Sequence, residues 1–349
     1  MTDLSIITVS YRGWERLTKS LEALNSFTGT KIRTEVIVVD NKSEDITIHS
    51  LESRFPSFRF IHNTVNGGFA NGCNLGAKNS SGEFLLFLNP DTIATETAIE
   101  EMLSTAGENP DISILSCRQV NEKGKESIAS GEFPEFWNLT GFLRAVSKSA
   151  KALFPLFSPH PAPRTAHHAP GTPHPAPPAG GRTLHLSFPD WVSGSVILIR
   201  KDLFHSIDGF DEDFWMYFED VDICKRVTDG GGKVAFCKNV AIEHNHGGSS
   251  RVNIRTASLT KTEVHISRHL YVSKHKKGIE KHLIQIFLVL DNMVSSSLMA
   301  VAGLILFFIP KIFARTVIFV RLIRYYSRAL IKLSWNSPRS VNSKNVKKN

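Results

Sequence analysis

Cysteine is scarce in this sequence, and its spacing excludes two common classes of small protein. The chain has 349 residues and four scattered cysteines, with no CxxC pair: Cys73, Cys117, Cys224 and Cys237. This excludes a disulfide-stapled miniprotein, argues against a cysteine-rich zinc site and fits a reducing compartment. The N-terminus also lacks a basic stretch followed by a long apolar run. We therefore expect no signal peptide there.

Several catalytic signatures are missing as well. A Gly/Asn-rich stretch at residues 66–76 does not end in GK[ST], so it is no P-loop. It does not directly follow the first expected strand either, which excludes a dinucleotide-binding fingerprint. No Ser/His/Asp or Cys/His arrangement is apparent. The stretch can still approach a diphosphate closely through its backbone N–H groups.

Acidic residues are rare in the C-terminal part of the chain. Residues 251–349 carry 18 Lys or Arg against 3 Asp or Glu, whereas residues 1–250 carry 23 basic against 30 acidic residues. An acidic globular part therefore precedes a basic segment. Such a segment favours a phosphate-rich partner, either an anionic lipid surface or nucleic acid.

Apolar runs alternate with helical periodicity over the first part of the chain. The runs predict strands at Leu4–Val9, Glu35–Val39, Phe58–Ile61, Glu83–Leu88 and Ile112–Ser116. Apolar spacing predicts helices at Trp14–Phe27, Asn74–Asn79 and Thr95–Ala106. The fold class expected is α/β, with a mostly parallel sheet flanked by helices. Ligands of such sheets bind beyond the carboxyl ends of the strands, where Ser10-Tyr11, Asp40-Asn41 and Asn89–Asp91 stand.

The middle of the chain changes character. Residues 155–189 hold 10 of the 16 prolines and five histidines, which predicts a disordered insertion. Order is expected to resume with one strand at Trp191–Ile199, a helix at Ile223–Thr228 and a short strand at Lys233–Phe236. We expect these elements to complete one domain over residues 1–250.

The basic segment is expected to be helical over residues 251–335, with a disordered basic tail at 336–349. A polar helix over Ala257–His275 precedes Leu283–Ile309, where Asp291 is the only charged residue. That length permits a membrane span. Polar residues at its middle and basic residues on both sides favour an interfacial anchor instead, as do the arginines at helical spacing in Lys311–Leu333. A single span or hairpin is the alternative, and an ordinary core helix is the second one.

Two groups of side chains suit a reaction at the sheet edge. Asp91 follows a buried strand, and His244 or His246 offers a second ligand for a hard cation such as Mg²⁺ or Mn²⁺. Further along, Glu219-Asp220-Val221-Asp222 opens a helix after five bulky residues. A carboxylate beside such apolar bulk has a raised pKa and suits a general base.

Seven segments taken in order resemble family 2 glycosyltransferases of the GT-A fold, in their rhamnosyltransferase-like branch. They cover about residues 3–250 apart from the insertion, and read ITVSY, VIVVDNKSED, NGGFANGCNLG, FLLFLNPDT, WVSGSVILIRKDLF, GFDEDFWMYFEDVDICKR and IEHNHGGSS. The resemblance implies a nucleotide site made by Val9, Ser10, Tyr11 and Asp40. It implies further donor or acceptor contacts at Asn66, Gly67, Gly68, Asn71, Asn74, Trp191 and Gly194.

The resemblance also implies the catalytic groups. Asn89-Pro90-Asp91 takes the place of the family's DxD motif, so that Asp91 faces a metal ion and Asn89 replaces the first acid. His244, or alternatively His246, is the late metal ligand. Asp220 matches the catalytic base. Glu219 and Asp222 support it, through acceptor contact or loop orientation.

The implied reaction is a single displacement that inverts the sugar. Mg²⁺ or Mn²⁺ neutralises the departing nucleoside diphosphate, while Asp220 takes the proton of the acceptor hydroxyl. The QxxRW motif of processive relatives is missing, so one or few sugars are added. We expect a dTDP-linked donor, rhamnose first, or else a UDP-linked one, since both bases offer an N3–H to Asp40. The expected acceptor is polyprenyl-diphosphate-linked or a saccharide, and the expected place is the cytoplasmic face of the plasma membrane.

Two other functions deserve comparison. A non-catalytic membrane scaffold on a decayed glycosyltransferase fold is supported only by Asn89 and opposed by Asp91, Asp220 and His244. Nucleic-acid binding by the basic segment is opposed by the apolar run from Leu283, which a soluble nucleic-acid-binding arm does not need. We therefore expect no nucleic-acid partner.

Overall fold

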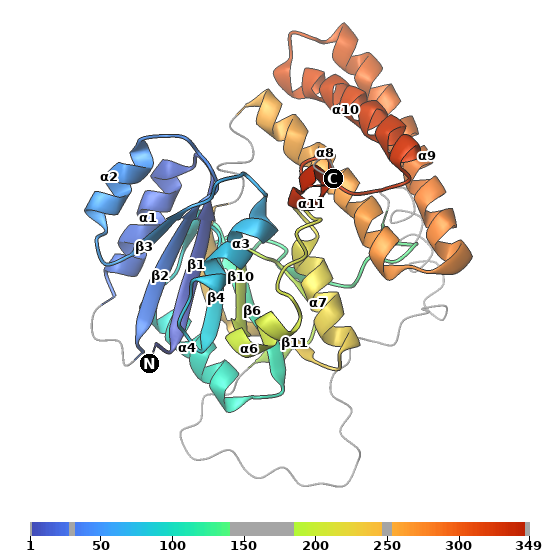
Figure 1. Ribbon diagram of the computed structural model, residues 1–349. Coiled ribbons are helices and arrows are strands. Elements are labelled where there is room, and N and C mark those ends of the chain that lie inside the picture. Colours follow the sequence, from blue (N-terminus) through green and yellow to red (C-terminus); the bar gives the residue numbers. More distant parts are fainter. Residues whose placement is uncertain (1, 28–31, 140–184, 246–252, 346–349) are drawn as a thin grey trace, which may run out of the picture.

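The computed structural model describes residues 2–27, 32–139, 185–245 and 253–345. Most of the insertion expected at 155–189 lies outside these residues, and so does His246. The described residues form a sheet covered by helices and a separate layer of long helices (Figure 1).

A mixed sheet of nine strands positions the strand ends. In spatial order the strands are β3 (Arg59–His62), β2 (Thr34–Asp40), β1 (Leu4–Ser10), β4 (Phe84–Leu88), β10 (Val196–Arg200), β6 (Ile112–Val120), β11 (Lys233–His244) and β5 (Thr92–Ile93), while β8 (Leu186–Ser187) pairs with β11. The first four pair in parallel. β10 runs antiparallel to both β4 and β6, so the sheet is mixed rather than mostly parallel.

Helices cover both faces of the sheet, as the α/β prediction requires. Successive side chains of a strand point to opposite faces, so Leu4 and Ile6 of β1 join one core and Ile7 and Val9 the other. The first core lies under α1 (Trp14–Asn25), α2 (Thr47–Arg54) and α4 (Glu96–Glu108). The second lies under α3 (Phe69–Lys78), α6 (Lys201–Ser206) and α7 (Glu219–Asp229). The sequence analysis did not predict α2 or α6.

The prediction of a single strand over Trp191–Ile199 is wrong. The chain forms β9 (Trp191–Val192), which pairs with β7 (Ser130–Gly131), then turns and enters β10. Gly194 lies in this turn, where its backbone bonds to the start of α7. The short strand expected at Lys233–Phe236 is in fact the beginning of β11, which continues past a register shift to His244.

Three long helices form a second layer beside the sheet (Figure 1). They are α8 (Ile254–His275), α9 (Gly278–Ile305) and α10 (Pro310–Lys332), close to the bounds that apolar spacing predicted. Polar groups buried between them satisfy one another. Tyr326 Oη accepts from Asn292 Nδ2 at 2.8 Å and lies 3.0 Å from His269 Nε2, and His269 Nδ1 contacts Gln285 Oε1.

Helix α9 leaves an apolar face uncovered. Among the described residues it is the one helix long and apolar enough to cross a membrane by length and composition, with a mean hydropathy of 1.7 over its most apolar window. Its exposed side chains recur every three or four residues and so share one side of the helix: Leu283, Ile286, Leu290, Val294, Leu298, Val301 and Leu304. The loop after it adds exposed Phe307 and Phe308.

The C-terminal segment is more ordered than expected. Residues 336–349 were expected to be disordered, yet Ser337 and Ser340 are buried and α11 (Val341–Asn345) follows them. Ser337 Oγ donates to Glu263 Oε2 of α8 at 2.8 Å, and the Arg339 guanidinium lies over the Trp215 ring at 5.2 Å. These contacts explain why residues 336–345 are ordered, although their composition is typical of a disordered tail. Residues 346–349 lie outside the described part.

Candidate active site

Parallel pairing brings the polar strand ends together. Ser10 pairs with Asp40 across β1 and β2, and Thr8 pairs with Leu88 at the end of β4. The segments that follow, which carry Tyr11, Asn41 and Asn89, therefore leave the sheet at one edge. This is the edge at which open α/β sheets bind ligands.

The nucleotide residues implied by the motifs are only partly accessible. Tyr11 is 44% exposed, whereas Val9 and Ser10 are buried, with Val9 packed toward Gly72 of α3. Asp40 is 5% exposed; its carboxylate accepts from the Ser43 N–H at 3.1 Å and also contacts the Ser43 hydroxyl. The side chains of Val9 and Ser10 thus belong to the core. Contact with a ligand at this point falls to Tyr11 and the backbone.

A network of asparagines holds the Gly/Asn-rich segment in place. Asn41 Nδ2 donates to the Gly68 carbonyl at 2.9 Å and to Asn66 Oδ1 at 3.3 Å. Gly68 has φ +91°, and a Cβ there would lie 1.8 Å from the Trp215 carbonyl oxygen. Only glycine therefore allows this approach. A Cβ at Gly67 would lie 2.3 Å from Oδ1 of Asn71, within the same segment.

Asn71 and Asn74 contact a loop of the protein, although the motifs implied contact with the donor. Asn71 Nδ2 donates to Glu212 Oε2 at 2.9 Å, and Asn74 Nδ2 donates to Glu212 Oε1 at 3.0 Å. Asn74 also bonds both the N–H and the carbonyl of Phe210, at 2.9 and 2.8 Å. These two amides therefore position the loop that leads into α7. Sequence analysis missed Glu212, which no local pattern connects to α3.

Asp220 is half-buried, and two backbone groups fix its carboxylate. The Gly194 N–H donates to Oδ2 and the Val221 N–H to Oδ1, each at 2.9 Å. Burial raises the pKa of Asp220 above its usual range, although these two hydrogen bonds act in the opposite direction. A fixed carboxylate with a raised pKa suits a general base.

Glu219 differs from its neighbour in being buried. Among the described residues its Oε2 atom has no hydrogen-bond partner. Burial raises the pKa of Glu219 well above its usual range, and the nearby charge of Asp220 adds to the rise. Tyr217 and Phe218, just before it, both have positive φ angles, 69° and 70°. Such backbone strain concentrates at functional sites.

Asp222 faces inward, which separates it from any substrate. It is buried, its Oδ2 atom accepts from Arg226 Nε at 2.8 Å, and its Oδ1 atom lies 2.7 Å from His275 Nε2 of α8. Burial opposes ionisation, but the His275 and Arg226 contacts outweigh it and lower the pKa of Asp222. Buried and with each oxygen bound to a protein side chain, Asp222 fits the role of loop orientation better than contact with the acceptor substrate.

Asp91 and His244 lie side by side, as the metal prediction requires. His244 Nε2 is 3.3 Å from Asp91 Oδ1, and His244 Nδ1 is 2.7 Å from Gln119 Oε1. Because an amide oxygen only accepts, Nδ1 of His244 carries a proton, which leaves Nε2, the nitrogen that faces Asp91, as the atom of a neutral imidazole that would bind a metal ion. Two ligands about 2.1 Å from one cation lie roughly 3 Å apart, so this donor set fits a divalent metal ion.

A basic side chain approaches the same carboxylate. Arg16 Nη1 lies 3.7 Å from Asp91 Oδ2 and donates to the Asn245 carbonyl oxygen. The Asn89 backbone N–H donates to the Ser195 carbonyl at 3.0 Å. Arg16 thus brings positive charge beside Asp91, in a motif where Asn89 stands in place of a first acid.

Comparison with known proteins assigns the chain to a family. Residues 5–164 match the family described as Glycosyl transferase family 2, and residues 183–246 match one described as N-terminal domain of galactosyltransferase. An N-acetylglucosaminyl-diphospho-decaprenol L-rhamnosyltransferase of Mycobacterium tuberculosis is 26% identical over 72% of this chain and 78% of its own length. Rhamnosyltransferase WbbL of Escherichia coli is 22% identical over 66% of this chain and 79% of its own length. Residues 5–164 therefore belong to glycosyltransferase family 2.

The GT-A expectation and the rhamnosyltransferase-like resemblance are thereby confirmed, and the chain is an enzyme of glycosyl transfer. Among solved structures, Staphylococcus aureus TarS residues 1–349 align with a TM-score of 0.48 and 14% identity, over 81% of this chain and 69% of that one.

In this glycosyltransferase, Trp191 lies beside the loop that leads into α7. It is not at the edge where β1, β2 and β4 end. Its Nε1 donates to the Glu132 carbonyl at 2.8 Å, and its ring packs in the cluster with Phe214 and Tyr271. The role of Trp191 that fits these contacts is support of the Asp220 loop. The direct substrate contact implied by the motif finds no support in this geometry.

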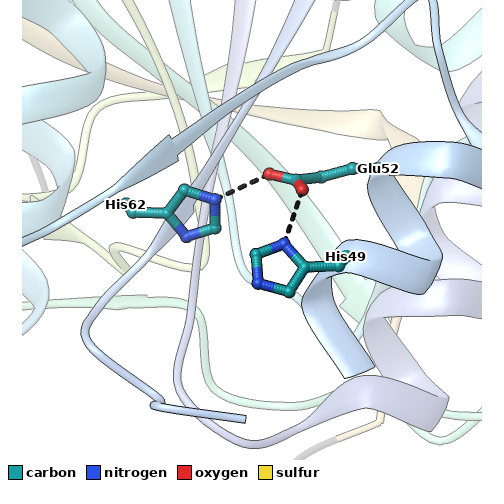
Figure 2. Close-up of side chains that lie close together, drawn as sticks. All are labelled: His49, Glu52 and His62. Carbon is teal, nitrogen blue, oxygen red and sulfur yellow. Dashed lines mark hydrogen bonds and ion pairs between the residues drawn. The ribbon is translucent and has the colours of Figure 1, made fainter. Parts of the chain in front are cut away.

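One further cluster of the glycosyltransferase escaped the sequence analysis. His49 and Glu52 on α2 meet His62 at the end of β3, with His49 Nδ1 2.9 Å from Glu52 Oε2 and His62 Nε2 2.6 Å from Glu52 Oε1 (Figure 2). These separations are shorter than the roughly 3.3 Å between ligands on zinc, so hydrogen bonds describe the cluster better than a metal centre. His62 Nδ1 lies 3.6 Å from Asp40 Oδ2. The cluster thus supports the back of the candidate nucleotide site.

Proposed function

We propose that this enzyme transfers one sugar from a nucleoside diphosphate to a lipid-linked saccharide, with inversion at the sugar. One structural relationship carries the proposal. The turn at Ser193–Ser195 joins both halves of the site, because Gly194 holds Asp220 while Ser195 bonds Asn89 through its carbonyl. The Ser195 hydroxyl also donates to Gln119 Oε1 at 2.7 Å, the atom that orients His244. The base and the metal pair therefore depend on one short segment.

The proposed donor is a dTDP-linked deoxysugar, rhamnose first. This choice is supported by Tyr11 and Asp40 at the ends of β1 and β2, because a carboxylate there would accept from the N3–H of thymine. A UDP-linked sugar is the second choice, since uracil offers the same N3–H. The Mycobacterium relative is named for rhamnosyl transfer to a decaprenol-linked diphosphate sugar. On that basis the proposed acceptor is a polyprenyl-diphosphate-linked saccharide, in surface polysaccharide or cell-wall synthesis.

Asp220 acts as the general base in this account. Its carboxylate takes the proton of the acceptor hydroxyl as the oxygen attacks the anomeric carbon, and the nucleoside diphosphate leaves from the opposite face. No protein nucleophile takes part, so one displacement inverts the configuration. Burial raises the pKa of Glu219 well above its usual range, which favours its neutral form and so limits the negative charge around Asp220. Asp222 and the pair Asn71–Asn74 keep the loop in position.

Asp91 and His244 would hold the metal ion. When bound, Mn²⁺ or Mg²⁺ supplies charge neutralisation for the leaving diphosphate. An imidazole ligand favours Mn²⁺ over Mg²⁺, which prefers oxygen atoms only. Asn89 adds no negative charge to hold the metal ion, whereas Arg16 beside Asp91 adds a positive charge that would attract the leaving diphosphate.

The apolar face of α9 is proposed to rest in a membrane. A soluble protein rarely exposes so continuous an apolar stripe, and the helix packed against α9, α10, carries several basic residues. Each basic residue near an anionic lipid surface contributes about 1 kcal/mol of binding. We propose peripheral attachment at the cytoplasmic face of the inner membrane, with the loop at Phe307-Phe308 inserted deepest.

A thermal-shift screen tests the proposed function. Purified enzyme is heated with dTDP, UDP and their sugar derivatives, each with Mn²⁺ or with EDTA. A ligand at 100 times its dissociation constant stabilises the fold by roughly 2.7 kcal/mol. A Mn²⁺-dependent shift with one nucleotide class supports the proposal, and NMR of the product's anomeric centre then tests inversion. No shift with any nucleotide in folded protein favours the scaffold alternative.

A further inference from the structure

A cavity of about 750 Å³ lies between the sheet edge and the helical layer. Tyr11, Asn66 and Trp215 line it on the sheet side, and residues of α8, α10 and the segment after α10 line it on the other. Asp91, His244 and Asp220 are not among its lining residues. The cavity therefore adjoins the candidate nucleotide residues but is separate from the metal pair and the base.

The lining of the cavity is strongly cationic. Five basic side chains contribute to it: Lys42, Arg321, Arg324, Arg328 and Arg339. The one acidic residue on the lining, Glu263, is 2% exposed and already accepts a hydrogen bond from Ser337. Arg339 Nε lies 3.8 Å from Glu263 Oε1, so this ion pair neutralises one of the five positive charges.

Two of the arginines have no carboxylate partner within the described part of the chain. Arg324 and Arg328 lie four residues apart on α10, so their side chains share a face of the helix, next to Arg321. Like charges held together in this way repel one another. An anion with several oxygens removes that repulsion, and the planar guanidinium binds such oxygens in pairs.

The position of the arginines also favours a ligand with an apolar chain. Helix α10 packs along α9, whose outer stripe of leucine, isoleucine and valine is uncovered. The cavity itself also has apolar lining beside the arginines, from Val65, Leu259 and Ile266. A nucleotide has no use for such a surface, whereas a prenyl chain does.

We infer that the cavity binds the diphosphate of the polyprenyl-linked acceptor, with Arg324 and Arg328 as its principal ligands. This inference rests on the proposed function, because it assigns the acceptor's charged group to a site of its own. The donor's diphosphate goes to Asp91 and His244, and the acceptor's diphosphate goes to α10. The sugar of the acceptor then extends along Trp215 toward the loop that carries Asp220.

The test measures binding rather than turnover. The full chain in detergent micelles is titrated calorimetrically with farnesyl diphosphate, farnesol, dTDP and UDP. We expect farnesyl diphosphate to bind and farnesol to bind at least tenfold more weakly. Arg324→Ala and Arg328→Ala should each weaken farnesyl diphosphate binding about tenfold, the loss of one charge-assisted contact. Neither variant should change the dissociation constants of dTDP and UDP by more than about twofold.

Arg315→Ala is the matched control. Arg315 is exposed on the same helix but does not line the cavity, so its removal changes the charge of α10 without changing the site. Unchanged farnesyl diphosphate binding in this variant supports the inference. Arg324→Lys should retain part of the affinity, since it keeps the charge and loses the paired hydrogen bonds.

Three outcomes overturn the inference. The first is equal binding of farnesyl diphosphate by the wild type and by the Arg324→Ala/Arg328→Ala double variant. In the second, the arginine variants lose dTDP or UDP instead, which would make the cavity part of the donor site. In the third, they lose only binding to phosphatidylglycerol vesicles, which would assign the arginines to lipid headgroups. If no sugar nucleotide stabilises the enzyme but farnesyl diphosphate binding needs the arginines, the proposed transfer fails while the cavity remains a prenyl diphosphate site.

Discussion

Asp220 Oδ2 accepts a 2.9 Å hydrogen bond from the backbone N–H of Gly194, 26 residues earlier in the chain. The contact ties the turn between β9 and β10 to the first turn of α7. It fixes the proposed base relative to Asn89, which Ser195 of the same turn contacts, and relative to His244, which Gln119 joins to Ser195.

Gly194→Ala should lower turnover without unfolding the enzyme. A Cβ at Gly194 would lie 3.3 Å from Asp220 Cβ and 3.4 Å from Phe69 Cε1, so the carboxylate must move by a few tenths of an ångström. Misplacement of a catalytic group is expected to lower kcat roughly 10- to 100-fold. Gly107→Ala, on α4 with open space around it, is the control. Steady-state kinetics decide, and unchanged kcat in Gly194→Ala would show that the carboxylate position is not critical.

Asp91→Asn should abolish the metal-dependent part of donor binding. The variant keeps the shape of the side chain and removes the charge that faces His244. Wild-type enzyme is expected to bind donor at least tenfold more tightly with Mn²⁺ than with EDTA, and the variant equally in both. Asp111→Asn, an exposed site paired with Lys233, should behave as wild type. A Mn²⁺ effect that persists in Asp91→Asn would remove Asp91 from the metal site.

His275→Ala should destabilise the fold through Asp222. The buried carboxylate would keep Arg226 and lose its second partner, at a cost of about 1–3 kcal/mol. The pKa of Asp222 is lowered in the fold, so this contribution is present above pH 4 and is lost in stronger acid. Urea unfolding at pH 7 measures it, with exposed His205→Ala as control. Equal stability of His275→Ala and wild type would mean that water replaces the imidazole without loss.

Glu263→Gln should change how stability depends on pH. Glu263 faces Ser337 and Arg339 from one side and Arg321 and Tyr325 from α10. Burial raises its pKa to about 7, although Ser337, Arg339 and Arg321 oppose the rise. The folded state therefore holds the proton more tightly than the unfolded state. The free energy of unfolding should fall by about 3 kcal/mol as pH rises from about 4.5 to about 7.

In Glu263→Gln this fall should disappear, so the variant should be the more stable protein at pH 8 and similar to wild type at pH 4.5. Urea unfolding at both pH values gives the comparison. Glu122→Gln, at an exposed position, should leave the wild-type profile intact. A parallel profile for Glu263→Gln and wild type would show that Glu263 ionises without penalty.

The sequence predicted most of the strands because each is a short apolar run buried on both faces, and such runs have few alternative placements. It placed Asp91, His244 and Asp220 at strand or helix ends, where the structure has them. It could not predict the direction of the Val9 and Ser10 side chains, since a fully buried strand shows no alternation. Nor could it predict the contact of Asn74 with Glu212, because the two residues are 138 positions apart and only the packing of α3 against the loop joins them.

The helical layer, too, could be predicted only in part from the sequence. Periodicity gave α8, α9 and α10 nearly to their ends. The folding of residues 336–345 back onto Glu263 depends on a buried hydroxyl–carboxylate contact that no local pattern predicts. The cationic cavity arises only from that packing, which brings Arg339 beside Arg321 and Arg324.

The most direct test of the account is the effect of Asp220→Asn on turnover and on donor binding, measured on the same preparation. Loss of a general base should lower kcat about 10²- to 10⁴-fold, while the dissociation constant of the donor with Mn²⁺ should change by no more than about twofold. That split would identify Asp220 as the base of a glycosyl transfer. A donor affinity that falls as far as kcat, or a kcat close to that of wild type, would contradict it.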